Sequence, residues 1–271
     1  MRGLSLVVLN MVGMLALSPA ASAATCGNDG SGFESWLSQY KREAVSRGMS
    51  SRAVNRVLSG VRYDPRVVRL DRSQKSFKLS FKQFYARRVS NSMIRRGRSY
   101  IENNRRLFSR IERDFGVPPE VIVSIWGLET GFGANSGKMS VMRSLATLAY
   151  DCRRSAFFTN ELDHAIQIVA RGDMSPDQMR GAWAGELGQT QFLASNYVKY
   201  AVDYDRNGHR DLIRSVPDVM ASTANYLKQK GWRAGQSWEA GTKNYRVLRE
   251  WNKAEVYVKT ISVMATKMAG R

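Results

Sequence analysis

The sequence of 271 residues predicts an all-α, mainly helical protein, and three observations support this fold class. Apolar residues recur at three- and four-residue intervals in seven segments, as they do on one face of a helix. No long stretch alternates apolar and polar residues in the manner of a half-buried strand. Glycine and proline fall between the periodic segments, where helices end and begin.

The first part of the chain supplies four of these helices. Periodic apolar residues predict them at 33–45, 51–58, 77–89 and 99–115. Gly48 follows the first pattern and Gly116 follows the fourth, and a glycine just past the last periodic residue commonly ends a helix.

Three more segments predict helices at 119–129, 158–170 and 218–229, and a last helix is expected near 254–268. Pro118 and Pro119 open the first of them, because proline suits the first turn of a helix. Gly172 ends the second and Gly231 the third. Neither a repeat nor a long linker interrupts the chain, so we expect one compact helical body.

The first 23 residues are typical of a cleavable secretory signal. An early Arg2 precedes an apolar run, which ends at the small-residue site Ala21-Ser22-Ala23. We expect cleavage after Ala23. The apolar run is too short for a retained membrane anchor, no later segment is apolar enough to span a bilayer, and Thr25 before Cys26 disfavours a lipoprotein.

Only two cysteines occur, Cys26 and Cys152. In an oxidising compartment a single disulfide between them is the expected pairing, with two unconnected thiols as the alternative. Closing so long a loop stabilises a protein by roughly 3 to 5 kcal/mol in the chain-entropy description.

The net charge is +19, and without the signal it is +18, from 41 basic and 23 acidic side chains. Such a charge suits nucleic acid, an anionic membrane surface or an acidic polysaccharide, or it serves solubility alone. The secretory signal favours a polyanion outside the cytoplasm. No compact nucleic-acid recognition motif occurs, so we expect no nucleic-acid partner.

Glu129 is the most conspicuous titratable residue. In SIWGLETGFG (124–133) it follows Trp126 and Leu128 near the end of a predicted helix. Apolar neighbours and the helix dipole both disfavour a carboxylate there, so both should raise the pKa of Glu129. A carboxyl group that holds its proton near neutral pH suits general acid catalysis, whereas an ordinary surface glutamate at a helix end is the alternative.

Four blocks in order carry a family resemblance: GVPPEVIVSIWGLETGFG (116–133), LATLAYDCRR (145–154), GAWAGELGQTQFLASNYVKYAVD (181–203) and STANYLKQKGW (222–232). Together they resemble the lytic murein transglycosylases of the membrane-bound lytic transglycosylase B-like family, which includes soluble homologues. Segments 71–85 and 248–261 also match, so the resemblance covers nearly the whole mature chain.

The resemblance implies a lysozyme-like catalytic core at 98–234, preceded by the signal at 1–23 and an N-terminal helical extension at 24–97. A C-terminal segment, 235–271, would pack back on the core through its return helix. It further implies a periplasmic monomer without a required cofactor. The implied activity is cleavage of the MurNAc-GlcNAc β-1,4 bond of peptidoglycan glycan strands without water, leaving 1,6-anhydro ends.

By the same resemblance Glu129 is the single catalytic acid, which first gives a proton and later takes one back. A usual glycosidase instead divides these tasks between two carboxylates. The positions implied to bind substrate are Arg153, Arg154, Gln191, Tyr226, Trp251 and Asn252. The basic pair would face peptide or lactyl carboxylates, and a tryptophan can stack on a sugar face. Surface charge and ordinary packing are the alternatives for these residues.

Glu186 departs from the family pattern, because membrane-bound relatives often carry a small or apolar residue at this position. It either adjusts Glu129 as a second carboxylate or is a charge at the start of a helix, and the second interpretation is slightly favoured.

The loop DYDRNGHRD contains the first half of a calcium motif. Asp203, Asp205 and Asn207 alternate before a glycine, His209 would add its backbone carbonyl, and Asp211 falls at position nine. Arg214 stands where the bidentate glutamate belongs. The resemblance implies that Asp218 closes the loop instead, so we expect weak structural calcium binding, with a metal-free turn as the alternative.

Two other functions remain open. Cys152 could be the nucleophile of a cell-wall cysteine peptidase with His164 or His209 as base. A non-catalytic basic wall-binding protein would keep the fold and charge without needing Glu129. No zinc-protease motif, paired-cysteine metal motif or Gly-rich phosphate loop occurs.

Overall fold

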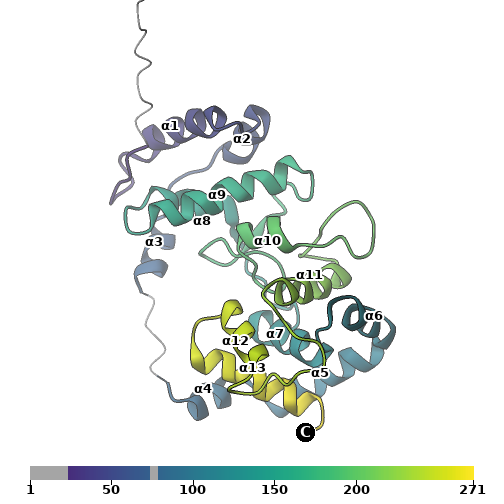
Figure 1. The fold of residues 1–271 in the computed structure, drawn as a ribbon. Helices are drawn as coiled ribbons and strands as arrows, with labels where there is room; N and C mark the ends of the chain where they lie inside the picture. Colours follow the sequence, from purple (N-terminus) through teal and green to yellow (C-terminus); the bar gives the residue numbers. More distant parts are fainter. Residues whose placement is uncertain (1–23, 74–78) are drawn as a thin grey trace, which may run out of the picture.

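The computed structural model describes residues 24–73 and 79–271, so the expected signal peptide lies outside the described residues. Its helices pack into a mainly α-helical body (Figure 1). They are α1 (Phe33–Ser46), α2 (Ser51–Leu58), α3 (Pro65–Arg72), α4 (Phe81–Arg88), α5 (Asn91–Asn103), α6 (Arg105–Phe115), α7 (Pro119–Thr130), α8 (Val141–Tyr150), α9 (Ser155–Ala170), α10 (Ala194–Tyr200), α11 (Val216–Gln229), α12 (Lys243–Trp251) and α13 (Glu255–Met268).

Helix α7 runs through the core. Every residue in it except Glu120 and Glu129 is buried, and α5, α6, α11 and α13 pack around it. A helix that is apolar on all sides is stable only when other elements cover each side. The C-terminal helix α13 therefore returns to the centre of the fold, where Met268 contacts the Ser124 hydroxyl of α7.

The glycine signals correctly predicted helix ends. Gly48, Gly116, Gly172 and Gly231 all have positive φ and lie just past α1, α6, α9 and α11. Gly116 is the left-handed C-cap of α6, and a residue without Cβ adopts this conformation without strain.

Two expectations about elements need correction. The single helix expected at 99–115 is broken at Asn104, whose backbone leaves helical geometry between α5 and α6. The helix expected from residue 77 begins at Phe81, where Ser80 and Gln83 form a capping box. A short antiparallel ribbon also exists, in which β1 (Met139–Ser140) pairs with β2 (Arg180–Gly181).

The N-terminal residues cover the rest of the molecule at two places. Helices α1 and α3 pack on α8, and α2 packs on α9, whereas α4 packs on α13 (Figure 1). The proposed boundary between residues 97 and 98 falls inside α5. The division into extension and core therefore remains a proposal.

A disulfide fixes the start of the described chain. Cys26 is bonded to Cys152, as expected, in the turn that follows α8. The Gly27 N–H donates to the Tyr150 carbonyl at 2.9 Å, and the Cys152 N–H donates to the Gly27 carbonyl at 3.3 Å. Covalent and backbone bonds thus attach this segment to the turn.

No helix among the described residues combines the length and the apolar character needed to cross a membrane.

Candidate active site

Glu129 lines a cavity of about 340 Å³ between α7, the loop after β2, α11 and the end of α12. The cavity brings together five residues predicted from the sequence, Glu129, Gln191, Tyr226, Trp251 and Asn252. Ala182, Trp183, Glu186, Phe192, Leu193 and Asn196 complete its lining.

The end of α7 fixes the position of Glu129. Gly131, the left-handed C-cap, stops the helix two residues later. The Thr130 hydroxyl donates to the Gln189 carbonyl at 2.6 Å and accepts the Gly133 N–H at 2.9 Å. Gly133 has a φ of 80°, which strains any residue with a Cβ, and a Cβ there would also lie 2.3 Å from the Gln189 side-chain oxygen, so the turn favours glycine. This packing aims the last turn of α7 at the cavity.

Two donors hold one oxygen of Glu129. Trp251 Nε1 donates to Oε1 at 2.9 Å, and the Tyr257 hydroxyl donates to the same oxygen at 2.8 Å. No described residue forms a hydrogen bond to Oε2. The carboxyl group is therefore oriented through Oε1, and Oε2 is the oxygen that can carry a proton to a ligand.

The surroundings raise the pKa of Glu129. Burial is the largest cause, and the negative charge of Glu186 acts in the same direction. The hydrogen bonds from Trp251 and Tyr257 and the positive charge of Arg88 oppose this rise by favouring the carboxylate. A carboxyl group with a fixed orientation and a raised pKa suits proton donation followed by proton acceptance.

Glu186 lies in the same cavity, and its predicted place at the start of a helix is wrong. It belongs to the loop between β2 and α10. Burial raises its pKa, while backbone N–H groups and Arg154 lower it. Its Oε2 is buried without a hydrogen bond from any described residue. The sequence could not place it, because the residues between β2 and α10 form turns rather than a helix.

Aromatic side chains form one wall of the cavity. The ring of Trp251 meets those of Phe192 and Tyr226 edge-on, with centroids 5.5 and 5.1 Å apart. The Tyr226 hydroxyl donates to the Glu250 carbonyl at 2.6 Å, which fixes its ring but commits its proton to the protein. Such a wall offers apolar faces to sugar rings.

Two amides are positioned by the backbone around them. Gln191, which has a positive φ of 54°, donates from Nε2 to the carbonyls of Gly188 and Ser136 at 2.8 and 3.1 Å. Asn252 accepts the Ala254 N–H at 2.9 Å, just before α13. Among the described residues, none bonds to the side-chain oxygen of Gln191 or to the side-chain amino group of Asn252, so both can bind a ligand.

Arg153 and Arg154 do not line this cavity. Both pair with the buried Asp71 of α3, with Arg153 Nη1 2.5 Å from one carboxylate oxygen and Arg154 in contact with the other. Their side chains are 48% and 42% exposed, so part of each guanidinium faces solvent. Their contacts in the structure join α3 to the turn after α8.

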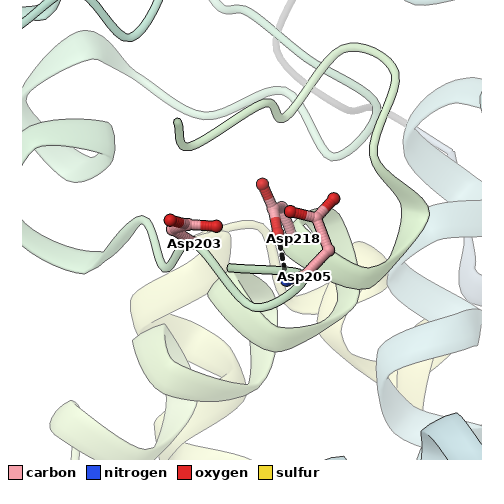
Figure 2. A group of neighbouring side chains, drawn as sticks. All are labelled: Asp203, Asp205 and Asp218. Carbon is pink, nitrogen blue, oxygen red and sulfur yellow. Dashed lines mark hydrogen bonds between the residues drawn. The ribbon is translucent and has the colours of Figure 1, made fainter. Parts of the chain in front are cut away.

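The predicted calcium loop brings three carboxylates together. One oxygen from each of Asp203, Asp205 and Asp218 lies within 4.8 Å of the other two. Figure 2 shows these three side chains in the loop. Asp218 accepts the N–H groups of Tyr204, Asp205 and Asp211, while Asp203 accepts that of Gly208.

The side chains of Asn207 and Asp211 accept hydrogen bonds from the loop backbone. The Asn207 side chain accepts the His209 N–H at 2.9 Å, and Asp211 accepts the N–H groups of Ile213 and Arg214. Asp211 does not belong to the carboxylate cluster. Oxygen atoms in this arrangement are the ligands that calcium prefers, so the three clustered aspartates fit a calcium ion.

Residues 32–242 match the transglycosylase SLT domain family. The chain belongs to this family. The resemblance inferred from the sequence is therefore confirmed.

Individual relatives agree with the family. A stretch of 122 residues is 40% identical to membrane-bound lytic murein transglycosylase B of Escherichia coli (strain K12), covering 45% of this chain and 34% of that relative. The aligned stretch thus spans about a third of that relative's length. SltB3 from Pseudomonas aeruginosa in complex with NAG-anhNAM-pentapeptide has a TM-score of 0.83 at 29% identity, covering 89% of this chain and 80% of that one. The Escherichia coli lytic transglycosylase Slt35 in complex with calcium shares the fold, with a TM-score of 0.77 at 22% identity, covering 91% and 96%. These neighbours confirm the lysozyme-like fold class.

The cysteine-peptidase alternative is wrong. Cys152 is part of the disulfide and so offers no thiolate. His164 lies on α9 with its Nδ1 at 2.7 Å from the Asn160 carbonyl of the same helix, and His209 lies in the aspartate-rich loop. No nucleophile and base meet at these residues.

Tyr257 is the functional candidate that the sequence analysis missed. It lies in segment 248–261, which was matched to the family, but its spacing alone gives no sign of a contact with Glu129. Burial and the nearby Glu129 raise its pKa well above 10, so it remains a hydrogen-bond donor at neutral pH. Trp183 and Asn196 were likewise not predicted to line the cavity.

Replacing Tyr257 by phenylalanine should move the alkaline limb of the activity profile to higher pH. The hydroxyl stabilises the Glu129 carboxylate, so its loss raises the pKa of Glu129, and a general acid then keeps its proton to higher pH. Initial rates of peptidoglycan solubilisation between pH 4 and about 9 measure this shift. Tyr245→Phe, which removes a hydroxyl bonded to Glu255 instead, is the matched control. An unmoved or lowered limb in Tyr257→Phe would contradict the assigned contact.

Proposed function

We propose that this protein is a lytic transglycosylase that cleaves the MurNAc-GlcNAc β-1,4 bond of peptidoglycan without water. The observation that supports this most is the cavity carboxyl group of Glu129, oriented by two donors at Oε1 and open at Oε2. Family membership supports the same reaction. SltB3 in complex with NAG-anhNAM-pentapeptide carries such an anhydro sugar, which supports this product class.

In the first step Glu129 acts as general acid. Its proton passes from Oε2 to the glycosidic oxygen as the bond between that oxygen and the muramic acid C1 breaks. Burial favours the protonated form needed at this point. The hydrogen bonds from Trp251 and Tyr257 then stabilise the carboxylate that the proton leaves behind, so the same contacts favour the product of the step.

In the second step the Glu129 carboxylate accepts the proton of the muramic acid C6 hydroxyl. The C6 oxygen bonds to C1, which closes a 1,6-anhydro ring and returns Glu129 to its protonated form. The nucleophile is already part of the substrate, so proximity replaces a second catalytic side chain. In this scheme Glu186 is not required for bond cleavage.

The other cavity residues would hold the sugars. Trp251 and Tyr226 would provide apolar ring surface, while Gln191 and Asn252 would bind hydroxyl or acetamido groups. Arg153 and Arg154 would use their exposed N–H groups on peptide or lactyl carboxylates, in addition to their bonds with Asp71.

Purified peptidoglycan sacculi test whether the protein is an enzyme. Catalytic amounts of the protein should release soluble muropeptides continuously, far beyond one fragment per protein molecule. A non-catalytic wall-binding protein would sediment with the sacculi and release none. That second outcome would reject the proposed function.

We also propose that Asp203, Asp205 and Asp218 hold a structural calcium ion, with Asn207 and the His209 carbonyl completing the ligands. Clustered carboxylates repel one another, and a divalent ion would offset this repulsion. The proposal assigns calcium to loop stability and gives it no part in bond cleavage.

Calcium should raise the melting temperature. A loop with weak, millimolar affinity saturates near 10 mM, and ligand at 10 to 100 times Kd stabilises by about 1.4 to 2.7 kcal/mol. The melting temperature of a protein of this size changes by about 2 to 4 °C for each kcal/mol of stability, so we expect it to rise by several degrees. Magnesium at equal concentration and the Asp203→Asn variant are the controls. A flat response of the wild type to calcium would make the loop a metal-free turn.

We further propose that the protein acts as a monomer in the periplasm. The support is the signal-like sequence of residues 1–23 and the family of the chain. Mature N-terminal sequencing of the secreted protein should begin at Ala24.

A further inference from the structure

A second and larger cavity lies beside the β1–β2 ribbon. It has a volume of about 620 Å³ and is bounded by α2, the start of α3, the first turn of α8 and the loop before β2. We call it the cationic cavity, because five basic side chains line it: Arg56, Arg66, Lys138, Arg143 and Arg180. They come from five separate segments of the chain, so one charged helix face does not explain their meeting.

These five cations are not neutralised within the described structure. None of them forms an ion pair with a described residue, whereas Arg72, Arg153 and Arg154 are each paired with a buried aspartate. In the described part of the chain, two carboxylates line the cationic cavity, those of Asp64 and Asp177. One of them, Asp64, already accepts the Arg66 backbone N–H as the N-cap of α3. An excess of positive charge around a hollow favours an anionic ligand.

The first turn of α8 adds polar groups to the same cavity. Helix α8 begins at Val141, and the positive end of a helix dipole attracts anions. Ser144, in that turn, lines the cavity and is 1% exposed, yet its hydroxyl has no hydrogen-bond partner among the described residues. A buried hydroxyl is normally paired. The Ser144 hydroxyl is therefore an unpaired polar group beside the cationic cavity among the described residues.

The location connects the cationic cavity with the site of Glu129. Arg180 of β2 lines the cationic cavity, and Ala182 and Trp183, which follow β2 directly, line the cavity of Glu129. The two cavities are thus lined by neighbouring positions of one segment, residues 180–183. Neutral sugars need no such charge, but peptidoglycan also carries short peptides with several free carboxylates, which arginine binds well.

We propose that the cationic cavity binds the free carboxylates of a peptidoglycan stem peptide whose glycan occupies the cavity of Glu129. This rests on the proposed function and extends it by naming a second recognition site. Arg66 and Arg143 are suited to test it, because neither side chain has a hydrogen bond or ion pair with a described residue. Both are exposed, so their replacement leaves the core intact.

Binding is measured in the Glu129→Gln protein, which keeps the ligand whole. The ligands are a disaccharide-peptide with free carboxylates, the same molecule with its carboxylates amidated, and the disaccharide without peptide. Arg66→Gln with Arg143→Gln should weaken binding of the free-carboxylate ligand by about five- to twentyfold, since one exposed ion pair contributes up to about a fivefold factor. Binding of the other two ligands should not change.

Arg105→Gln with Arg106→Gln is the matched control. It removes the same charge from exposed positions of α6, which lies away from α2, α3 and α8 in Figure 1. An equal loss of affinity in this control, or no effect of amidation, would overturn the inference. The proposed function would still stand in that case, provided that the disaccharide without peptide binds. Failure of all three ligands to bind would overturn both. Inorganic phosphate could bind more strongly than the peptide and lose this binding in the Arg66→Gln, Arg143→Gln protein. That result would overturn the assignment of the ligand as a carboxylate.

Discussion

Replacing Glu129 by glutamine should reduce the rate of peptidoglycan cleavage by at least about 10⁴-fold. Loss of a general acid or base typically costs 10²- to 10⁴-fold, and Glu129 is proposed to act in both steps. Glutamine keeps the size of the side chain and can still accept the hydrogen bonds from Trp251 and Tyr257. It can neither give nor recover a proton, so the loss of cleavage rate reports on proton transfer and not on folding.

Glu186→Gln is the matched control, because it changes the other carboxyl group of the same cavity in the same way. We expect a reduction of less than about tenfold, below the usual range for a general acid or base. Both variants should melt close to the wild type. A larger loss in Glu186→Gln than in Glu129→Gln would transfer the catalytic role to Glu186, and full activity of Glu129→Gln would reject its assignment.

Removal of the disulfide should give the largest change in stability. Cys26 and Cys152 are 126 positions apart, and closing a loop of that length restricts the unfolded chain by roughly 3 to 5 kcal/mol. The Cys26→Ser, Cys152→Ser protein should therefore have a free energy of unfolding lower by about this amount and a melting temperature lower by about 10 °C.

Urea unfolding of the double variant and of oxidised and reduced wild type measures the effect. Reduced wild type should match the double variant, because both lack the same covalent bond. Thiol labelling of denatured, unreduced wild type should find no free thiol. Equal stability of all three proteins would show that the disulfide contributes nothing to folding.

Much of the fold could be predicted because local rules determine it. The spacing of apolar residues and the positive-φ glycines predicted α1, α2, α7, α9, α11 and α13 closely. Helix α8 was not among the predicted helices, although all its residues but Arg143 are buried in the fold. Helix α10 is only seven residues long, which is too short for a periodic pattern.

The site was predictable only in part. The apolar residues around Glu129 and the glycines after it are local, and they correctly indicated a carboxyl group near a helix end. Its two donors lie 122 and 128 positions further along the chain, at Trp251 and Tyr257. No spacing rule relates residues so far apart. Glu186 was misplaced for a similar reason, because tertiary turns rather than a local motif bring it to the cavity.

The chemical form of the products tests the central claim most directly. Digestion of peptidoglycan by the wild type, followed by mass spectrometry before and after borohydride treatment, distinguishes the two possible reactions of this cavity. If Glu129 serves both steps, the fragments carry 1,6-anhydro ends, are lighter than hydrolysis products by one water, and do not change with borohydride. Fragments that contain the added water and are reduced by borohydride would show that the two carboxyl groups act as a hydrolase and would contradict the transglycosylase mechanism.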